Sequence, residues 1–166
     1  MNNSQIIKRV GRWAKKQFPE IIIGYERVYK ISADLAGISK PYMRIDVVAK
    51  NKSGREIFGV ECKTINDHKT FREIATAIGQ AYVLKRMFGR AYIALEVNKS
   101  FLEKYKTVRY SWLTNINDEL GIGVIFVNRN VVLIEEAKYE EPGATTLFVP
   151  LASKYDYPSK TKTRIY

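Results

Sequence analysis

Two runs of residues on either side of a short turn constrain this chain most. Residues 44–50 and 55–64 are rich in β-branched and aromatic side chains, and "NKSG" between them contains the glycine typical of a tight turn. They predict two antiparallel strands joined as a hairpin. A similar run at 21–31 precedes them, so this part of the chain predicts a three-stranded meander.

Helical periodicity flanks the meander on both sides. Apolar residues recur at helical spacing from Ser4, a suitable N-cap, until Pro19 ends the pattern. After the meander, Thr70 and Glu73 form a capping-box pattern that begins a helix, and Gly89 ends it. These signals predict one helix before the three strands and a longer one after them.

The second half of the chain continues this alternation. Residues 91–97, 123–128 and 131–137 predict strands, and a capping-box pattern at Ser100 predicts one long helix that ends at Gly121. Hairpin-linked strands combined with helical crossovers indicate an α/β fold, in which helices flank a central mixed β-sheet.

Composition limits the classes of protein to consider. The 166 residues suit one domain, predicted over 1–152, followed by a basic tail over 153–166. A formal charge of +11 favours polyanionic partners. One cysteine and one histidine exclude a disulfide framework and the usual zinc sites. Without a secretory signal or an apolar run of about 20 residues, we expect a cytoplasmic protein with no membrane partner.

The hairpin carries two acids that ought to repel each other. A two-residue turn at Ser53 and Gly54 would place Asp46 across from Glu61, with about 4.5 to 5.5 Å between Cβ atoms. Such carboxylates repel unless one is protonated or a cation joins them, and oxygen ligands select Mg²⁺ or Mn²⁺. Lys63, on the same face as Glu61, is suited to orient a water or stabilise charge on a phosphate. The set predicts metal-dependent phosphodiester hydrolysis.

This spacing also carries a family resemblance. Asp46, then fourteen residues, then Glu61, Cys62 and Lys63, resembles the PD-(D/E)XK nuclease superfamily of restriction endonucleases, Holliday-junction resolvases and related exonucleases. The resemblance covers residues 4–97 and implies a restriction endonuclease-like αβββαβ core. It implies metal bound by both carboxylates and the main-chain carbonyl of Cys62. Ile45 stands where the family's proline would precede Asp46.

Two further positions match the family. Glu26, in "GYERV", matches an additional acid that serves the site and can bind metal, with Asp34 as an alternative. Gln80, in "IGQAYVLK", matches a helical glutamine near the active site, although Tyr82 lacks the spacing of the tyrosine that accompanies it in some exonuclease branches. The candidate catalytic residues are Glu26, Asp46, Glu61, Lys63 and Gln80.

Two other interpretations compete with this site. The sequence repeats the E-x-K pattern at Glu136 and Lys138, but there the upstream acid, Asp118, falls near the end of a predicted helix. Alternatively, the hairpin acids lie on a solvated sheet face and pair with Arg44, Arg55 or Lys63. The apolar neighbours in "IDVV" and "FGVE" favour strands covered on both faces.

The leading hypothesis is a Mg²⁺-dependent DNA endonuclease. A single domain without a target-recognition module favours selection by DNA structure, with junction resolution as the first subtype and a homodimer as the matching assembly. The first helix carries five cations suited to phosphate contacts: Lys8, Arg9, Arg12, Lys15 and Lys16. A non-catalytic nucleic-acid-binding or assembly module with the same fold, or an RNA nuclease, are the alternatives.

Overall fold

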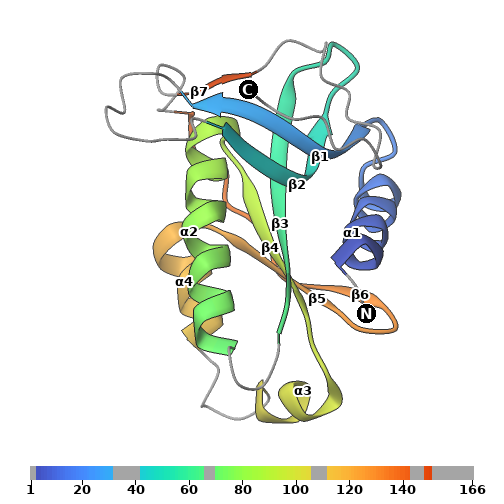
Figure 1. The fold of residues 1–166 in the computed structure, drawn as a ribbon, viewed down its shortest axis with the longest axis vertical. Coiled ribbons are helices and arrows are strands. Elements are labelled where there is room, and N and C mark those ends of the chain that lie inside the picture. The colour runs from blue at the N-terminus through green and yellow to red at the C-terminus, as the bar shows by residue number, and fades with distance from the viewer. Residues whose placement is uncertain (1–2, 32–41, 66–69, 106–111, 143–147, 151–166) are drawn as a thin grey trace.

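The computed structural model describes residues 3–31, 42–65, 70–105, 112–142 and 148–150, which form one mixed sheet with helices on both faces (Figure 1). The predicted α/β class is therefore confirmed. The helices are α1 (Asn3–Gln17), α2 (Thr70–Phe88), α3 (Lys99–Tyr105) and α4 (Trp112–Leu120). The strands are β1 (Ile22–Ile31), β2 (Tyr42–Lys50), β3 (Glu56–Thr64), β4 (Ala91–Glu96), β5 (Gly123–Val127), β6 (Val131–Glu135) and β7 (Phe148–Pro150).

The sheet has seven strands in the order β6-β5-β4-β3-β2-β1-β7. β1, β2 and β3 form the predicted antiparallel meander, whereas β4 pairs parallel with both β3 and β5. A parallel pair needs a crossover, and α2 provides the one between β3 and β4, so α2 runs antiparallel to both strands. β7, which pairs with β1, was not predicted.

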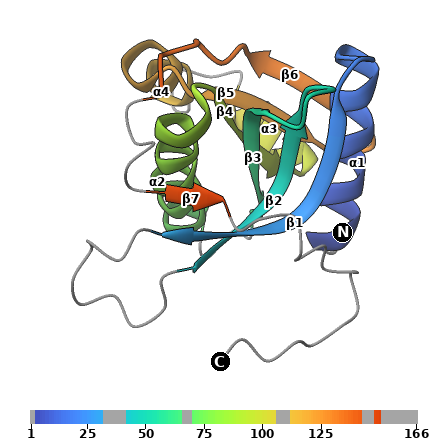
Figure 2. The ribbon, with the colours of Figure 1, turned by 90° about the horizontal axis from the view of Figure 1, so that it is seen from above.

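Two apolar cores lie on the two faces of the sheet, and Figure 2 shows α1 on one side with α2 and α4 on the other. On the α1 face, Ile6, Val10 and Ala14 are buried in one core cluster with Val60 of β3. On the opposite α2 face, the cluster contains residues of α2, α3 and α4: Ile74, Ala77, Ala81, Leu84, Phe88, Phe101, Leu113 and Ile116. The amphipathic helices thus bury their apolar sides against opposite faces.

The strand β3 divides its side chains between these two cores. Cys62 is buried in the cluster on the α1 face. Gly59 lies beneath Leu84 and Phe88 of α2, because a Cβ added there would meet both side chains within 3.3 Å. Residues two apart on a strand share a face, so Glu61 also belongs to the α2 face.

The C-terminal end of α2 is fixed by a glycine and a buried lysine. Gly89 has φ +82°, which confirms the predicted left-handed cap. Lys85 donates to the carbonyl of Leu120 at the end of α4 (2.8 Å) and pairs with Glu140 (3.0 Å). The amide of Glu140 in turn donates to the carbonyl of Gly89 (2.9 Å). These contacts join the ends of α2 and α4 to the segment that follows β6.

The prediction of one long helix that ends at Gly121 is wrong in two respects. The structure has two helices there, α3 and α4, and residues 106–111 between them lie outside the described ranges (Figure 1). The N-cap of α3 also lies two residues earlier than predicted, because the Asn98 side chain, in place of Ser100, accepts from the amide of Phe101 (2.7 Å). The ring of Phe101 packs edge-on against Phe126 of β5, which anchors α3 to the sheet.

The predicted tail, 153–166, and Asp34 both lie outside the described residues. Within the ranges that are described, the longest helices lack the apolar length needed to cross a bilayer.

Candidate active site

The second and third strands of the meander, β2 and β3, separate at the predicted acids. β2 pairs with β3 from the turn as far as Val47 opposite Val60. Beyond this point β2 pairs only with β1, while β3 continues beside β4 from Glu61 to Thr64. Figure 1 shows β1 and β2 crossing above α2 while β3 and β4 run downward. We call this separation, with Asp46 on one arm and Glu61 on the other, the fork.

The predicted register is correct at the fork, but the predicted turn is wrong. Val47 faces Val60 as expected, whereas the ladder shifts after Ala49, so that Lys50 faces Glu56. The turn is longer than two residues, and the Asn51 side chain organises it by accepting from the amide of Arg55 (2.9 Å). The longer turn and the bulge offset each other, because the bulge adds one residue on β3. One further step along the ladder would place Asp46 opposite Glu61.

Asp46 is buried and bonded to the backbone of the other arm. The residue is only 4% exposed, and its Oδ2 accepts from the amide of Cys62 (2.9 Å). The carboxylate therefore satisfies an amide that β2 leaves without a ladder partner. Burial raises the pKa of Asp46, although the Cys62 amide and the charge of Lys63 partly oppose this shift.

The main-chain carbonyl of Cys62 is directed to the same side of β3 as its amide, toward Asp46. In an extended strand the N–H and C=O of one residue point to the same side, and successive residues alternate. The amides of Gly59 and Ile65 donate to carbonyls on the β4 side. Cys62 falls at the alternate position, so its carbonyl, like its amide, is directed toward β2 and Asp46. This direction fits the predicted main-chain ligand.

Glu61 is as buried as Asp46 and contacts the predicted lysine. It is 4% exposed, and its Oε1 accepts from Nζ of Lys63 (2.7 Å). Burial, followed by the charge of Asp46, raises the pKa of Glu61 to about 7, even though Lys63 acts in the other direction. Asp46, Glu61 and Lys63 are thus brought together, with Glu61 near half ionisation at neutral pH.

Glu26 completes a row of three acids across adjacent strands. Tyr25 faces Val47 and Arg27 faces Ile45, so Glu26 lies in the row of Asp46. The charge of Glu26 contributes to the raised pKa of Asp46. The row runs from β1 through β2 to Glu61 on β3.

Glu26 also has an unusual backbone conformation. Its φ of +47° lies in the left-handed region, which costs a non-glycine residue on the order of 1 to 3 kcal/mol. The alternation of side chains reverses there: Ile23 packs against the α1-face core, whereas Tyr29, an even number of residues later, belongs to the α2-face core. On β2, Val47 belongs to the α1-face core, whereas Ile45, two residues earlier, belongs to the α2-face core. Both strands therefore change faces at the acids, where the fork opens.

Arg44 is a site residue that sequence reasoning treated only as a surface ion-pair partner. Its Nη1 lies 3.5 Å from Oε1 of Glu26, and its charge lowers the pKa values of Asp46 and Glu61. Its position two residues before Asp46 on a strand was the available signal, because such residues share a face in a regular strand.

Gln80 lies on the helix that covers the fork. Leu84 of α2 lies over Gly59, and α2 runs antiparallel to β3, so Gln80, one turn before Leu84, lies toward Glu61 and Lys63. Its Oε1 is buried and has no hydrogen-bond partner among the described residues. Buried polar atoms are rarely left unpaired, because the lost hydration costs about 1 to 3 kcal/mol. The atom is suited to bind a water or ligand at the fork.

The donor set fits a hard cation with few protein ligands. In the described ranges no three His, Cys, Asp or Glu side chains gather closely enough to hold a metal ion by themselves. Glu26 is turned to Arg44, and Glu61 to Lys63. Mg²⁺ needs only one or two carboxylates because it keeps several waters. Asp46, Glu61 and the Cys62 carbonyl supply such a set, provided that Lys63 yields Oε1 of Glu61.

The predicted phosphate-binding cations of α1 lie away from the fork. α1 packs on the face opposite Glu61 (Figure 2). Two of the five cations bond to backbone carbonyls outside α1. Arg9 donates to the carbonyls of Asn128 (2.6 Å) and Arg129 (3.0 Å), and Lys15 donates to those of Pro19 and Ile21 (2.7 and 2.6 Å). Lys8, Arg12 and Lys16 are exposed on the same helix.

The second E-x-K pattern does not form a comparable arrangement. Glu136 accepts from the hydroxyl of Tyr92, whereas Lys138 pairs with Asp118 at 3.2 Å. Both residues are exposed and follow the end of β6.

Neither a scan against protein-family models nor a search of curated proteins finds a match to this chain. Function must therefore be inferred from the chemistry of the fork.

Proposed function

We propose that this protein is a metal-dependent nuclease that hydrolyses DNA phosphodiester bonds, with the fork as its active site. The observation that supports this most strongly is the row of Glu26, Asp46 and Glu61 across three adjacent strands. Two of these acids are buried with raised pKa values. Perturbed, mutually repelling acids destabilise a fold, and they concentrate at functional sites.

Each residue of the fork has a role in this proposal. Asp46, Glu61 and the Cys62 carbonyl would hold Mg²⁺, or Mn²⁺ in its place. A bound metal of this kind lowers the pKa of a water and neutralises charge on the phosphate. Glu26 and Arg44 set the charge around Asp46, since their ion pair lies in the same row.

Lys63 and Gln80 act beside the metal ligands. With a cation bound at Oε1 of Glu61, the Lys63 ammonium would be free to donate to the attacking water or to a phosphate oxygen. The unpaired Oε1 of Gln80 accepts from that water and orients it. Both groups come from regular elements, β3 and α2, and positions on such elements are held more precisely than positions on loops.

The order of elements supports the resemblance to the PD-(D/E)XK superfamily. The chain runs α1, β1, β2, β3, α2 and β4, and the acids lie on β2 and β3 as that family requires. We propose membership of this superfamily on that basis. Structure-selective endonuclease activity, a homodimer and a cytoplasmic location belong to the same proposal.

One observation favours a second candidate, a non-catalytic nucleic-acid-binding or assembly module with the same fold. Lys63 and Glu61 are already paired at 2.7 Å, so the carboxylate has a cation without any metal. In such a module the acids would be retained as a structural ion-pair row. Nucleic acid would still bind through the positive surface, but no phosphodiester bond would break.

Digestion of a panel of substrates separates these candidates. The panel contains supercoiled plasmid, linear duplex, single-stranded DNA, a four-way junction and RNA of matching sequence, each with Mg²⁺, Ca²⁺ or EDTA. The nuclease proposal predicts Mg²⁺-dependent DNA cleavage that is absent in EDTA, with the junction cut preferentially. Cleavage of RNA alone would favour the RNA nuclease. Binding without cleavage of any substrate would favour the non-catalytic module.

A further inference from the structure

A positively charged groove lies between α1 and the β5–β6 hairpin, on the face opposite the fork. Its volume is about 740 Å³. Three of its cations come from α1 and one from the hairpin turn: Arg9, Arg12, Lys16 and Arg129. Trp13 and Leu133, which pack against the core of the α1 face, supply apolar lining. None of the described residues that line the groove is acidic.

The groove is held in shape by one of its own cations. Nη1 of Arg9 donates to the carbonyls of Asn128 and Arg129, which ties α1 to the hairpin turn. These acceptors are neutral carbonyls, so they do not compensate the charge of Arg9. Among the described residues, neither Arg9, Arg12, Lys16 nor Arg129 has a carboxylate partner. Uncompensated cations in a concave site attract polyanions.

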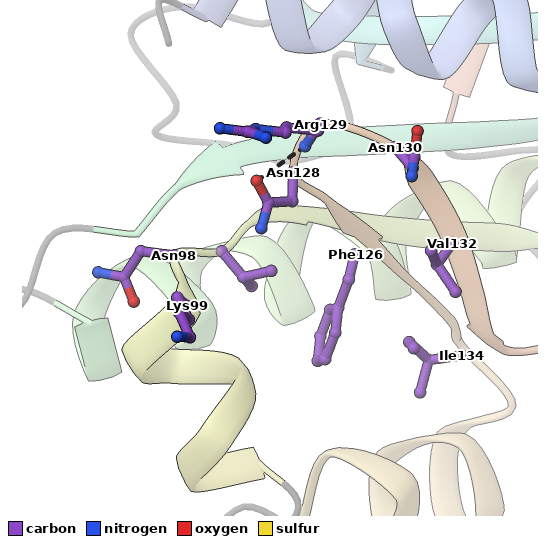
Figure 3. Close-up of a pocket in the computed structure, with 9 residues that line it drawn as sticks. Asn98, Lys99, Phe126, Asn128, Arg129, Asn130, Val132 and Ile134 are labelled. Carbon is purple, nitrogen blue, oxygen red and sulfur yellow. Dashed lines mark hydrogen bonds between the residues drawn. The ribbon is translucent and has the colours of Figure 1, made fainter.

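The hairpin turn separates this groove from a second hollow of about 720 Å³. Figure 3 shows the side chains of Phe126 and Ile134 in that hollow, while those of Arg129 and Asn130 lie at its rim on the side of α1. Phe126 and Ile134 belong to the α2-face core. Arg129 lines both hollows and Lys99 lines the second, whereas the three cations of α1 line only the groove.

A phosphodiester backbone fits the groove better than an anionic lipid surface does. An amphipathic helix binds a membrane by inserting its apolar side, but Ile6, Val10 and Ala14 of α1 are buried against the sheet. A concave surface also makes poor contact with a flat bilayer. Four cations that lack a carboxylate partner among the described residues instead match the phosphates of a nucleic-acid strand, whose binding is driven by counterion release.

The position of the groove decides which segment of nucleic acid it can hold. Glu61 belongs to the α2 face, while the groove is built on α1, so a sheet lies between the two sites. We infer that the groove binds a DNA segment other than the one at the fork, which makes this a protein with two separate DNA contacts. The inference rests on the proposed function for the identity of the segment at the fork, and it implies branched or paired DNA as the substrate class.

Salt-dependent binding tests the groove itself. The triple variant Arg12→Ala, Lys16→Ala, Arg129→Ala is compared with Lys52→Ala, Lys99→Ala, Lys138→Ala, which removes three exposed, ion-paired lysines elsewhere. Both variants lose the same charge. In EDTA, the slope of log affinity for duplex DNA against log salt should fall by about 2 to 3 in the groove variant, at about 0.9 per lost phosphate contact. The control should change by less than about one. Equal slopes in the two variants would overturn the inference.

A tethered duplex tests whether the two contacts are separate. Thr76 is exposed on α2, one turn before Gln80, and the native Cys62 is only 1% exposed, so Thr76→Cys provides a selective attachment point. A short duplex joined there occupies the α2 face. The adduct should still bind a second labelled duplex, and this binding should be lost when the groove substitutions are added. An adduct that binds no second duplex would show a single shared path and overturn the inference.

These results are distinguishable from failure of the nuclease proposal, because neither assay requires cleavage. If both binding results hold but no substrate is cut in Mg²⁺, the groove remains a DNA contact and the fork is not a nuclease site. If wild type prefers vesicles containing anionic lipid to DNA, and the groove variant loses that preference, the assignment of the groove to nucleic acid is wrong.

Discussion

The carboxyl group of Glu61 is close to its ionisation midpoint at neutral pH. Burial and the neighbouring Asp46 raise its pKa from 4.5 to about 7, so its protonated form is the one that the fold prefers. The stability that results is fully present below the unfolded pKa and is lost as pH rises through the folded value. The metal-free protein should therefore become less stable between about pH 4.5 and pH 7.

Glu61→Gln tests this pH dependence. The substitution keeps the shape of the side chain but cannot ionise, so it should stabilise the metal-free protein at about pH 8, by up to about 3 kcal/mol for a pKa raised from 4.5 to about 7. At about pH 4.5 the two proteins should unfold at nearly the same urea concentration. If the two proteins were equally stable at both pH values, ionisation of Glu61 would not destabilise the folded state and this explanation would be wrong.

Lys63 distinguishes an active site from a structural ion pair. Removing its ammonium leaves Oε1 of Glu61 without the contact at 2.7 Å and removes a charge that opposes a cation. Lys63→Ala should bind Mn²⁺ at least as tightly as wild type in calorimetry at about pH 8, while the cleavage rate should fall by about 10² to 10³. Partial rescue by Lys63→Arg would indicate charge stabilisation in place of proton transfer. Abolished Mn²⁺ binding, or a wild-type rate, would contradict the assigned role.

At this scale the sequence predicts some residues and misses others for physical reasons. The neighbourhood of Asp46, Glu61 and Lys63 follows from strand alternation and hairpin register, which are local rules. The left-handed φ of Glu26 does not, because only the surrounding sheet can impose that conformation on a residue with a Cβ.

Among the elements, the hairpin shows how a correct register can follow from a wrong turn. The sequence suggested a two-residue turn, whereas the structure has a longer turn and a compensating shift after Ala49. Bulges depend on how two strands twist together, so they leave little trace in one strand's sequence. The division between α3 and α4 was missed because both helices bury apolar residues in the same core, which gives them one continuous periodicity.

Two glycines of the α2 region give a matched test of element ends. Gly89 has φ +82°, and an added Cβ would approach the Tyr139 ring at 2.6 Å, so Gly89→Ala should destabilise the protein by about 1 to 3 kcal/mol in urea unfolding. Gly79 is exposed within α2 and has open space around its Cβ position. Gly79→Ala should therefore stabilise by about 0.5 to 1 kcal/mol. The same sign for both variants would contradict this account of the α2 end.

At the scale of the whole molecule, the sheet separates two kinds of chemistry. Glu61 and Lys63 face α2, whereas the cations of the groove lie beside α1. The sequence predicted both sets but not their placement on opposite faces, because net charge and helical periodicity carry no information about which side of a sheet a helix covers. Under the proposed function, DNA bound along α1 would therefore lie on the other side of the sheet from the fork.

The most direct test of the account is a plasmid-nicking time course in Mg²⁺ with two matched variants. Asp46→Asn keeps the acceptor for the Cys62 amide but removes the charge of a proposed metal ligand. Glu136→Gln makes the same change in the second E-x-K pattern, where Glu136 accepts from Tyr92. We predict that wild type and Glu136→Gln nick the plasmid at similar rates, and that Asp46→Asn is slower by on the order of 10² or more. A wild-type rate in Asp46→Asn, or a loss of nicking in Glu136→Gln alone, would contradict the assignment of the active site to the fork.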